Sequence, residues 1–319
     1  MTDSSNQKAM YLSQFSESSQ PLDLSQSDEF ASLCESAKDL GIRFETPVRY
    51  ASCNTVVRHQ RFHFLSWGDV SKQTIVLLHG GNQSAHSWDL VSLHLSRDYH
   101  VVALDQRGHG DSEWNRGADY GIDEMSLDAE AFIEMLGPEP PVLVGHSMGG
   151  MVSLTTALRR PDLLKCMVVV DVGPEVGEEG RKMIHDFVGR NIEFDDMETF
   201  LDRVAEYDQF RSREHIERTL KYNLIRRADG KYVSKADRRR FSQSRPSFTL
   251  EDFGGLTLPT LIIRGEESNI LEPDAAVRFC DALPHGQLKV VPDCGHNVAS
   301  QNTTGFLAAL EPFLEQQIS

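Results

Sequence analysis

Short apolar runs recur along most of this chain, and longer segments with apolar residues three and four positions apart separate them. The runs are rich in β-branched residues and lead into Gly, Asp, His or Ser; they read TIVLLHGG, HVVALDQRG, PVLVGHS, CMVVVDVG, TLIIRGE and QLKVVPDCGH. Helical spacing occurs at 123–136, 148–160, 273–283 and 303–317. Strands that are apolar along their whole length and alternate with helices predict an α/β fold with a mostly parallel, doubly wound sheet.

The residues that close these runs predict where a ligand binds. In a parallel sheet the carboxyl ends of the strands lie at one edge, and ligands bind beyond that edge. The glycines, histidines and acids of the runs fall at these strand ends. We therefore expect the functional residues along that edge.

Two stretches depart from the alternation of strands and helices. Residues 1–27 are rich in Ser and Gln and lack a sustained apolar period, which predicts a flexible tail. A short amphipathic helix is expected next, ending near Gly41. From residue 175 to 256 charged, helix-prone pieces replace the strand–helix units, and they predict a helical cap over the carboxyl edge of the sheet. The core would then comprise residues 28–174 and 257–319.

The predicted cap contains a basic run, KADRRRFSQSR. A solvated loop or helix face is the usual explanation of such a run, and a surface that holds an anionic substrate is the alternative. Large side chains of the same interval would suit either an apolar chamber over the site or the packing of the cap itself. They are Phe187, Phe200, Leu201, Tyr207, Phe210 and Tyr222.

Composition narrows the classes of function. The 319 residues are 39% hydrophobic and 25% charged, as is typical of a globular protein. A net charge of −16 argues against nucleic acid and anionic membrane surfaces as partners. The five cysteines have no paired spacing, and no run approaches the roughly 18 apolar residues of a membrane span. We expect a cytoplasmic protein that acts on a small-molecule substrate, with its oligomeric state open.

One strand-to-helix junction is unusual in its small residues. The run PVLVGHSMGG places Ser147 between a strand pattern and a helix pattern, with Gly145 and Gly149 two positions to either side. Glycines there let strand and helix approach closely, and the sharp turn pushes the serine hydroxyl out of the sheet edge. The helix that begins beside the serine would add backbone N–H groups and positive potential. The pattern indicates a nucleophilic serine, although G-x-S-x-G alone arises by chance in roughly one such chain in ten.

Together with this junction, several further motifs resemble the α/β-hydrolase family. They occur in the family's order as TIVLLHGGNQSAHSW, ALDQRGHGDSEW, VGHSMGG, VVVDVGP, LIIRGEES and PDCGH. The resemblance extends from about residue 46 to the C-terminus, with the interval at 175–256 in the family's cap position. It implies a sheet of the α/β-hydrolase type with an inserted helical cap. Within the family, the chain looks most like small capped hydrolases, whose substrates include esters, lactones and cleavable carbon–carbon bonds.

The resemblance also implies an oxyanion hole after the strand that ends in LLHGG. Carried onto this sequence, its donors are the backbone N–H groups of Gly81, Asn82 and Met148. A tight turn that needs glycine is the alternative explanation of the loop after the strand. The neighbouring His79 and His146 are expected to orient these loops rather than to react.

The chain has 12 histidines, and most are expected to be structural. In DQRGHG, for example, Asp105, Arg107 and His109 predict a turn held by hydrogen bonds. His296 stands apart because it follows KVVPDCG, a strand and a glycine turn, after Ser147 and after every candidate acid. That is the Ser…acid…His order of the family, so the resemblance implies His296 as the general base.

The acid is where the sequence departs from the family. The usual Asp follows the strand TLIIRG, but the loop here reads GEESNIL, with Ser268 at that position and Asn269 beside it. A second arrangement in the family has the acid at the end of the preceding strand, where Asp171 stands in VVVDVGP. Both strand ends open toward the histidine loop. We expect Asp171 to be the acid, with Glu267 as the alternative; a purely structural, buried Asp171 is the remaining possibility.

Ser147, His296 and Asp171 thus predict a serine hydrolase that cleaves a carboxylic ester or related acyl substrate through an acyl-enzyme. Hydrolysis of a lactone or a carbon–carbon bond is an alternative, because the same serine and histidine serve both reactions. A weakly catalytic ligand receptor is another, motivated by the missing Asp after TLIIRG. No metal or nucleotide cofactor is expected, since the chain lacks H-E-x-x-H and a G-x-G-x-x-G that opens a helix after a strand.

Overall fold

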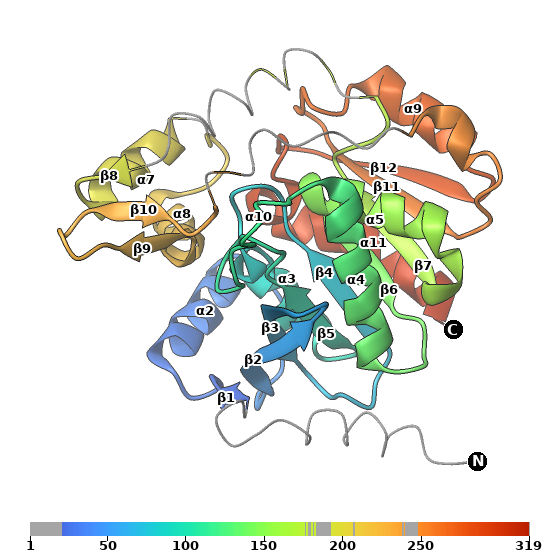
Figure 1. Ribbon diagram of the computed structural model, residues 1–319. Coiled ribbons are helices and arrows are strands. Elements are labelled where there is room, and N and C mark those ends of the chain that lie inside the picture. Colours follow the sequence, from blue (N-terminus) through green and yellow to red (C-terminus); the bar gives the residue numbers. More distant parts are fainter. Residues whose placement is uncertain are drawn as a thin grey trace.

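The computed structural model describes residues 21–175, 177, 180, 182, 193–206, 208–237, 239 and 248–318. At its centre is a nine-stranded sheet in the order β1-β2-β3-β5-β4-β6-β7-β11-β12 (Figure 1). Its strands are β1 (Leu22–Asp23), β2 (Tyr50–Val57), β3 (Gln60–Trp67), β4 (Thr74–Leu78), β5 (His100–Leu104), β6 (Val142–His146), β7 (Cys166–Val170), β11 (Thr260–Gly265) and β12 (Gly286–Val291). The six strands from β5 to β12 in this order are parallel, which confirms the predicted α/β class.

Helices cover both faces of the sheet, because residues that alternate along each strand are apolar on both sides. One face carries α2 (Asp28–Asp39), α3 (Asp89–Leu95), α10 (Val298–Gln301) and α11 (Thr303–Ile318). The other face carries α4 (Ile122–Leu136), α5 (Met148–Arg159) and α9 (Pro273–Ala282). Short 3-10 turns lie at η2 (Ala85–Trp88), η3 (Pro161–Leu163), η4 (Lys221–Asn223) and η6 (Leu250–Phe253).

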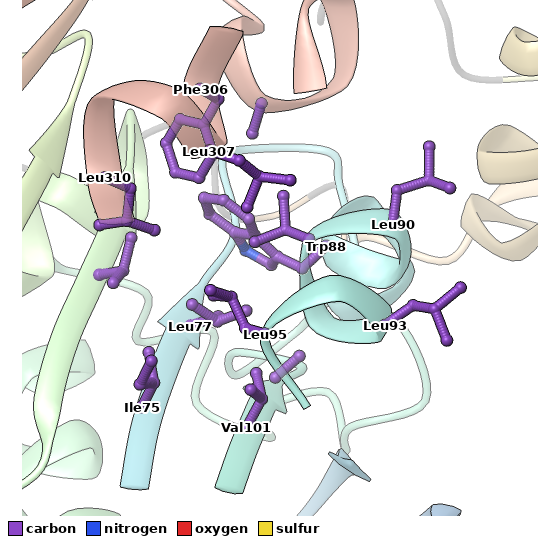
Figure 2. Packing of buried hydrophobic residues seen from close by; sticks show 14 of the residues in the cluster. Ile75, Leu77, Trp88, Leu90, Leu93, Leu95, Val101, Phe306, Leu307 and Leu310 are labelled. Atoms are coloured by element: carbon purple, nitrogen blue, oxygen red, sulfur yellow. The ribbon is translucent and has the colours of Figure 1, made fainter. Parts of the chain in front are cut away.

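On the first of these faces, a hydrophobic core forms around Trp88, which is 2% exposed. Figure 2 shows its ring among Leu77 of β4, Leu95 of α3 and Leu307 of α11. The ring of Phe306 lies 5.9 Å away, centroid to centroid. Side chains from three separate parts of the sequence therefore fix the sheet against α3 and α11.

The N-terminal region joins the fold earlier than the sequence predicted. Leu22 and Asp23, assigned to the tail, form β1 and pair antiparallel with β2. Two residues are too few for a strand to show an apolar period. The helix predicted next is α2, which begins after Ser27, whose side chain accepts a hydrogen bond from Phe30 N. The rest of the predicted tail, residues 1–20, lies outside the described residues.

The inserted segment, residues 175–256, contains strands as well as helices. Its described part includes α7 (Met197–Ala205) and α8 (Arg213–Leu220), together with β8 (Glu193–Phe194), β9 (Leu224–Arg226) and β10 (Tyr232–Ser234). The strands form a sheet in the order β8-β10-β9, apart from the main sheet (Figure 1). The sequence predicted only helices here, because strands of two or three residues are too short to show alternation. A turn signal was present in Asp229-Gly230, where Gly230 has a φ of 91°.

The large side chains of the inserted segment lie in different surroundings. Phe200 and Leu201 are buried in its own small core, as the packing explanation requires. The Tyr222 ring stacks on His86 of η2 at 3.5 Å between centroids, so it joins the segment to the main domain. Phe210 is 36% exposed. Phe187, Tyr207 and most of the basic run KADRRRFSQSR lie outside the described residues.

Candidate active site

Ser147 lies at a strained turn between β6 and α5. Its backbone has a φ of 51° and a ψ of −114°, a conformation that residues other than glycine rarely adopt. Two backbone hydrogen bonds hold the turn, from Ser147 N to Val170 O at 3.0 Å and from Met151 N to Ser147 O at 3.0 Å. The turn directs the residue to the carboxyl edge of the sheet, where it is partly exposed.

The glycines around the serine are required by close approaches of the backbone. A Cβ on Gly145 would lie 2.3 Å from Gly149 O, inside the contact distance of any real Cβ. A Cβ on Gly149 would lie 2.4 Å from Leu78 O at the end of β4. The first turn of α5 thus packs directly against the two strand ends, as the sequence pattern indicated.

Ser147, His296 and Asp171 lie in one line of hydrogen bonds. The Ser147 hydroxyl is 2.9 Å from Nε2 of His296, and Nδ1 of the same ring is 2.8 Å from Oδ2 of Asp171. An ionised carboxylate only accepts, so Nδ1 carries a proton and Nε2 is free to accept the hydroxyl proton. These residues come from β6–α5, the loop after β12 and the end of β7, so the fold brings together side chains up to 149 positions apart.

The Asp171 carboxylate is fully buried, with 0% of its surface exposed. Oδ1 accepts a hydrogen bond from Gly265 N at 3.1 Å, and Oδ2 accepts one from the Ser268 hydroxyl in addition to that of His296. A buried carboxylate needs such donors to remain ionised. Asp171 also has a positive φ of 53°, a second strained position at this edge of the sheet.

The alternative acid is placed differently. The Glu267 side chain is exposed, and the residue's backbone N–H donates to Cys294 O at 3.0 Å. Asn269 is exposed as well. Among the described side chains, the carboxylate in contact with His296 is therefore that of Asp171. Sequence reasoning missed the contact of Ser268 with this carboxylate, although the loop GEESNIL drew attention to the position.

The loop after β4 and the start of α5 are neighbours. β4 pairs in parallel with β6, with Leu78 opposite Gly145, so Gly81 and Asn82 follow a strand adjacent to the one that precedes the serine. Asn82 has a positive φ of 62°. Met148 is the first residue of α5, and the N–H groups of a first helical turn have no partners within the helix. The three predicted oxyanion donors thus lie in the loop after β4 and at the start of α5.

His146 lies directly behind the candidate site. Its Nε2 is 2.9 Å from the backbone oxygen of His296, and the two rings are 4.8 Å apart. Nε2 therefore donates to that oxygen, and Nδ1 lies 3.2 Å from Oε1 of Gln83, which accepts from Gly80 N at 2.9 Å. Burial first, and then the neighbouring His296 charge, lowers the pKa of His146 to about 3. His146 is therefore neutral and positions the histidine loop, as predicted.

The DQRGHG segment is held by hydrogen bonds and ion pairs, as predicted. Arg107 binds both carboxylate oxygens of buried Asp128 and donates to Asp119 O at 2.8 Å. Nδ1 of His109 lies 3.0 Å from Arg107 O. Nearby, His79 accepts from Gln106 N at 3.1 Å, which leaves its Nδ1–H to donate to Gly80 O at 2.7 Å. These contacts fix the loops around the candidate site.

Asp105 belongs to a group of side chains with the composition of a metal site. His63, Asp105 and Asp111 place one ligand atom each within 4.8 Å of one another. The Asp105 carboxylate already accepts from His63 at 2.7 Å and from the backbone N–H groups of Ala85 and Asp111. Burial alone would raise the pKa of Asp105, but these bonds and the charge of His63 hold it below its usual range. The arrangement is that of a structural carboxylate, and the expectation of no metal stays a prediction.

The inserted segment contacts the loop of His296 through Gln301. Nε2 of Gln301 donates to Asp208 at 3.0 Å, and its Oε1 accepts from Gly295 N at 2.9 Å. Asp208 is buried and forms a 2.6 Å ion pair with Arg211. The Phe210 ring lies 3.4 Å from where a Cβ on Gly295 would stand. One amide thus links the inserted segment to the residue before His296.

The described helices include none with the length and apolar character needed to cross a membrane.

Comparisons with known proteins find a matching family and several similar proteins. The family described as alpha/beta hydrolase fold matches residues 73–303. Esterase Rv0045c of Mycobacterium tuberculosis is 28% identical over 304 residues, which cover 90% of this chain and 96% of that protein. The sn-1-specific diacylglycerol lipase ABHD11 of Mus musculus is 29% identical over 260 residues, or 77% of this chain and 82% of the lipase.

Solved structures give the same fold. A structure of the M. tuberculosis esterase has a TM-score of 0.74 at 25% identity and covers 90% of this chain and 99% of its own. The solved E-2-(acetamidomethylene)succinate hydrolase has a TM-score of 0.77 at 23% identity, with 84% of this chain and 100% of that one covered. The second likeness concerns the fold alone.

Proposed function

This chain belongs to the α/β-hydrolase fold family, and from that premise we propose that it is a serine hydrolase of carboxylic esters. The nucleophile is Ser147, the general base is His296, and the acid is Asp171. The observation that supports this assignment most is the line of hydrogen bonds of 2.9 and 2.8 Å that joins the three side chains. The esterase and lipase names of its relatives support the ester as substrate.

The proposed reaction begins when the Ser147 oxygen attacks the carbonyl carbon and its proton moves to Nε2 of His296. The oxyanion that forms accepts hydrogen bonds from the N–H of Met148 and from that of Gly81 or Asn82. The intermediate then collapses, and the departing alcohol takes the proton from His296. Water, deprotonated by the same ring, releases the acid from the acyl-enzyme.

Asp171 supports each of these proton transfers. Its buried carboxylate fixes the ring so that Nε2 faces the serine, and its negative charge stabilises the imidazolium that forms. The strained backbone at both Ser147 and Asp171 supports a functional role for these positions, since strain of this kind clusters at active sites. The missing Asp after TLIIRG therefore does not require a weakly catalytic receptor.

The proposal assigns residues 28–174 and 257–319 to the catalytic core and residues 175–256 to a cap. The position of Phe210 beside Gly295 and the bond between Gln301 and Asp208 support this assignment. We expect a small-molecule substrate, with neither nucleic acid nor a membrane as partner. The cytoplasmic localisation also stays a prediction.

Rates of hydrolysis test the proposal. Wild type should hydrolyse p-nitrophenyl esters faster than lactones, and Ser147→Ala should abolish the activity. Ser153→Ala is the matched control, because Ser153 lies on the same helix with its hydroxyl bound to Gly149 O at 2.8 Å. It should retain activity. If lactones or carbon–carbon substrates are hydrolysed faster than esters of every acyl length, the result would favour the alternative hydrolase classes.

A further inference from the structure

Ser268 occupies the loop after β11, and its side chain is directed at the buried acid. The residue is 6% exposed, and its hydroxyl contacts Oδ2 of Asp171. The same oxygen lies 2.8 Å from Nδ1 of His296. Ser268 and His296 thus share one carboxylate oxygen.

The direction of this bond follows from the neighbours of the hydroxyl. Its oxygen accepts a hydrogen bond from Ile270 N at 3.2 Å. The ionised carboxylate of Asp171 has no proton to give, so the hydroxyl proton of Ser268 points to Oδ2. Ser268 is therefore a donor to the acid.

Backbone contacts hold this serine in place. Its N–H donates to Gly265 O at 3.1 Å, and its own carbonyl accepts from the guanidinium of Arg264 at 2.9 Å. Arg264 is buried and also donates to Leu271 O at 2.7 Å and to Glu266 O at 3.0 Å. The loop geometry thus keeps the hydroxyl at a fixed position beside Asp171.

We propose that Ser268 is a positioning residue that holds the Asp171 carboxylate oriented toward His296. This inference rests on the proposed function, since it acts through the proposed acid. Three donors reach the buried carboxylate, namely Gly265 N, Nδ1 of His296 and the Ser268 hydroxyl. Loss of the hydroxyl leaves Oδ2 with the histidine alone, and a buried charge that has lost a donor is costly.

The pH profile responds to this bond because Ser268 holds Oδ2 at the position where it pairs with the imidazolium. Without the hydroxyl, Asp171 pairs less closely with the protonated ring, so the rate falls and the acid limb of the rate profile moves to lower pH. Among the described residues, other titratable groups near the loop of His296 are His146 of β6, Cys294 and Asp293 of that loop, Glu266 and Glu267 beside Ser268, and Asp208 of the inserted segment through Gln301. Substitution of Ser268 removes none of these groups.

The experiment compares kcat/KM for a p-nitrophenyl ester against pH in wild type, Ser268→Ala and Ser96→Ala. Ser96 is the matched control, because it is also buried and its hydroxyl donates to Leu93 O at 2.8 Å in α3, a bond unrelated to the site. We expect Ser268→Ala to lose about tenfold to a hundredfold, the range for one hydrogen bond to a charged group, and to show the shifted acid limb. Ser96→Ala should keep both the rate and the profile.

A double-mutant cycle separates this role from a general loss of packing. If Ser268 acts through Asp171, Ser268→Ala should cost little more in an Asp171→Asn background, whereas independent losses would multiply. A rate within about twofold of wild type with an unmoved acid limb, or multiplying losses, overturns the inference. If the alanine variant does not fold, Ser268→Thr, which keeps a strong donor, should exceed Ser268→Cys, which keeps the size with a weak donor; equal rates contradict the proposal.

Failure of the proposed function gives a different pattern. A folded wild type with no ester hydrolysis above that of Ser147→Ala overturns the proposed function, and the inference falls with it. An active wild type whose Ser268→Ala variant is equally active contradicts the role of Ser268 alone.

Discussion

Asp171 and Glu267 follow two neighbouring strands, and their side chains have opposite surroundings. The Asp171 carboxylate is buried in contact with His296, and the Glu267 side chain is exposed. We expect Asp171→Asn to leave the fold intact and reduce kcat by up to ~10⁴, because the ring is left in the wrong tautomer. Glu267→Gln should change kcat little on the same ester. A fully active Asp171→Asn enzyme together with an inactive Glu267→Gln enzyme would contradict the assignment.

His146 makes the stability of the protein depend on pH. Burial first, and then the charge of His296, lowers the pKa of His146 to about 3 in the folded state, against about 6.5 unfolded. Between these values the unfolded chain binds a proton that the folded one does not, so stability falls as pH falls through this range. The slope is about 1.4 kcal/mol per pH unit.

The free energy of unfolding in urea, measured from pH 7 to pH 4, should therefore fall less in His146→Gln than in wild type. His215 is partly buried, and burial lowers its pKa to about 4, so it acts in the same direction and keeps part of the slope. His285→Gln serves as the control, since this histidine is exposed. An unchanged slope in His146→Gln would contradict the buried neutral state.

Sequence reasoning was strong for residues whose role fixes a local pattern. Ser147 needs glycines at set positions, and these leave a readable signature. The acid has no such signature, because either strand end could hold it, and only the direction of the side chains separates Asp171 from Glu267. The sequence shows Ser268 in place of the usual Asp, but its donor role depends on a contact with a residue 97 positions away.

At the scale of elements, the approach of β4 and α5 is the contact that shapes the site. A Cβ on Gly149 would meet the backbone oxygen of Leu78 at 2.4 Å, and neither backbone can yield cheaply. We expect Gly149→Ala to destabilise the protein by about 1–3 kcal/mol, despite the better helix propensity of alanine, and to reduce ester hydrolysis.

Gly255→Ala is the control for this prediction. A Cβ there meets no atom within 4 Å, so thermal unfolding should stay near that of wild type or rise slightly. If Gly149→Ala unfolded at the same temperature as Gly255→Ala, close packing would not be the reason for the glycine.

The strands of the main sheet were predictable where they are long and apolar on both faces. Each predicted run from TIVLLHGG to QLKVVPDCGH overlaps one of β4, β5, β6, β7, β11 and β12. β1 and the strands of the inserted segment were missed, because two or three residues show no period. A strand of that length is set by its partner rather than by its own sequence. β2 was also missed, although it has eight residues, because polar residues interrupt its sequence YASCNTVV.

At the scale of the whole molecule, the inserted segment is attached to the loop of His296 by the Gln301 amide. Gln301→Glu would keep the acceptor for Gly295 N but place a carboxylate against Asp208. Like charges at this distance repel, so the segment should detach more often. Limited proteolysis should then cut faster within residues 175–256, while the unfolding of the core changes less.

The matched control for this prediction adds Asp208→Asn to Gln301→Glu, which restores a donor–acceptor pair without two negative charges. It should recover part of the protection. Equal cleavage rates for wild type and Gln301→Glu would show that the amide does not hold the segment. No sequence pattern could have predicted this contact, because it joins side chains 93 positions apart.

The central claim is that Ser147 is the nucleophile and His296 its base. A fluorophosphonate probe tests it most directly, because it forms a covalent bond only with an activated serine. Intact-protein and peptide mass spectrometry should find one adduct on wild type, at Ser147. Ser153→Ala should be labelled as fast as wild type, His296→Ala far more slowly, and Ser147→Ala not at all. A folded wild type that stays unlabelled, or an adduct that persists in Ser147→Ala, would contradict the account.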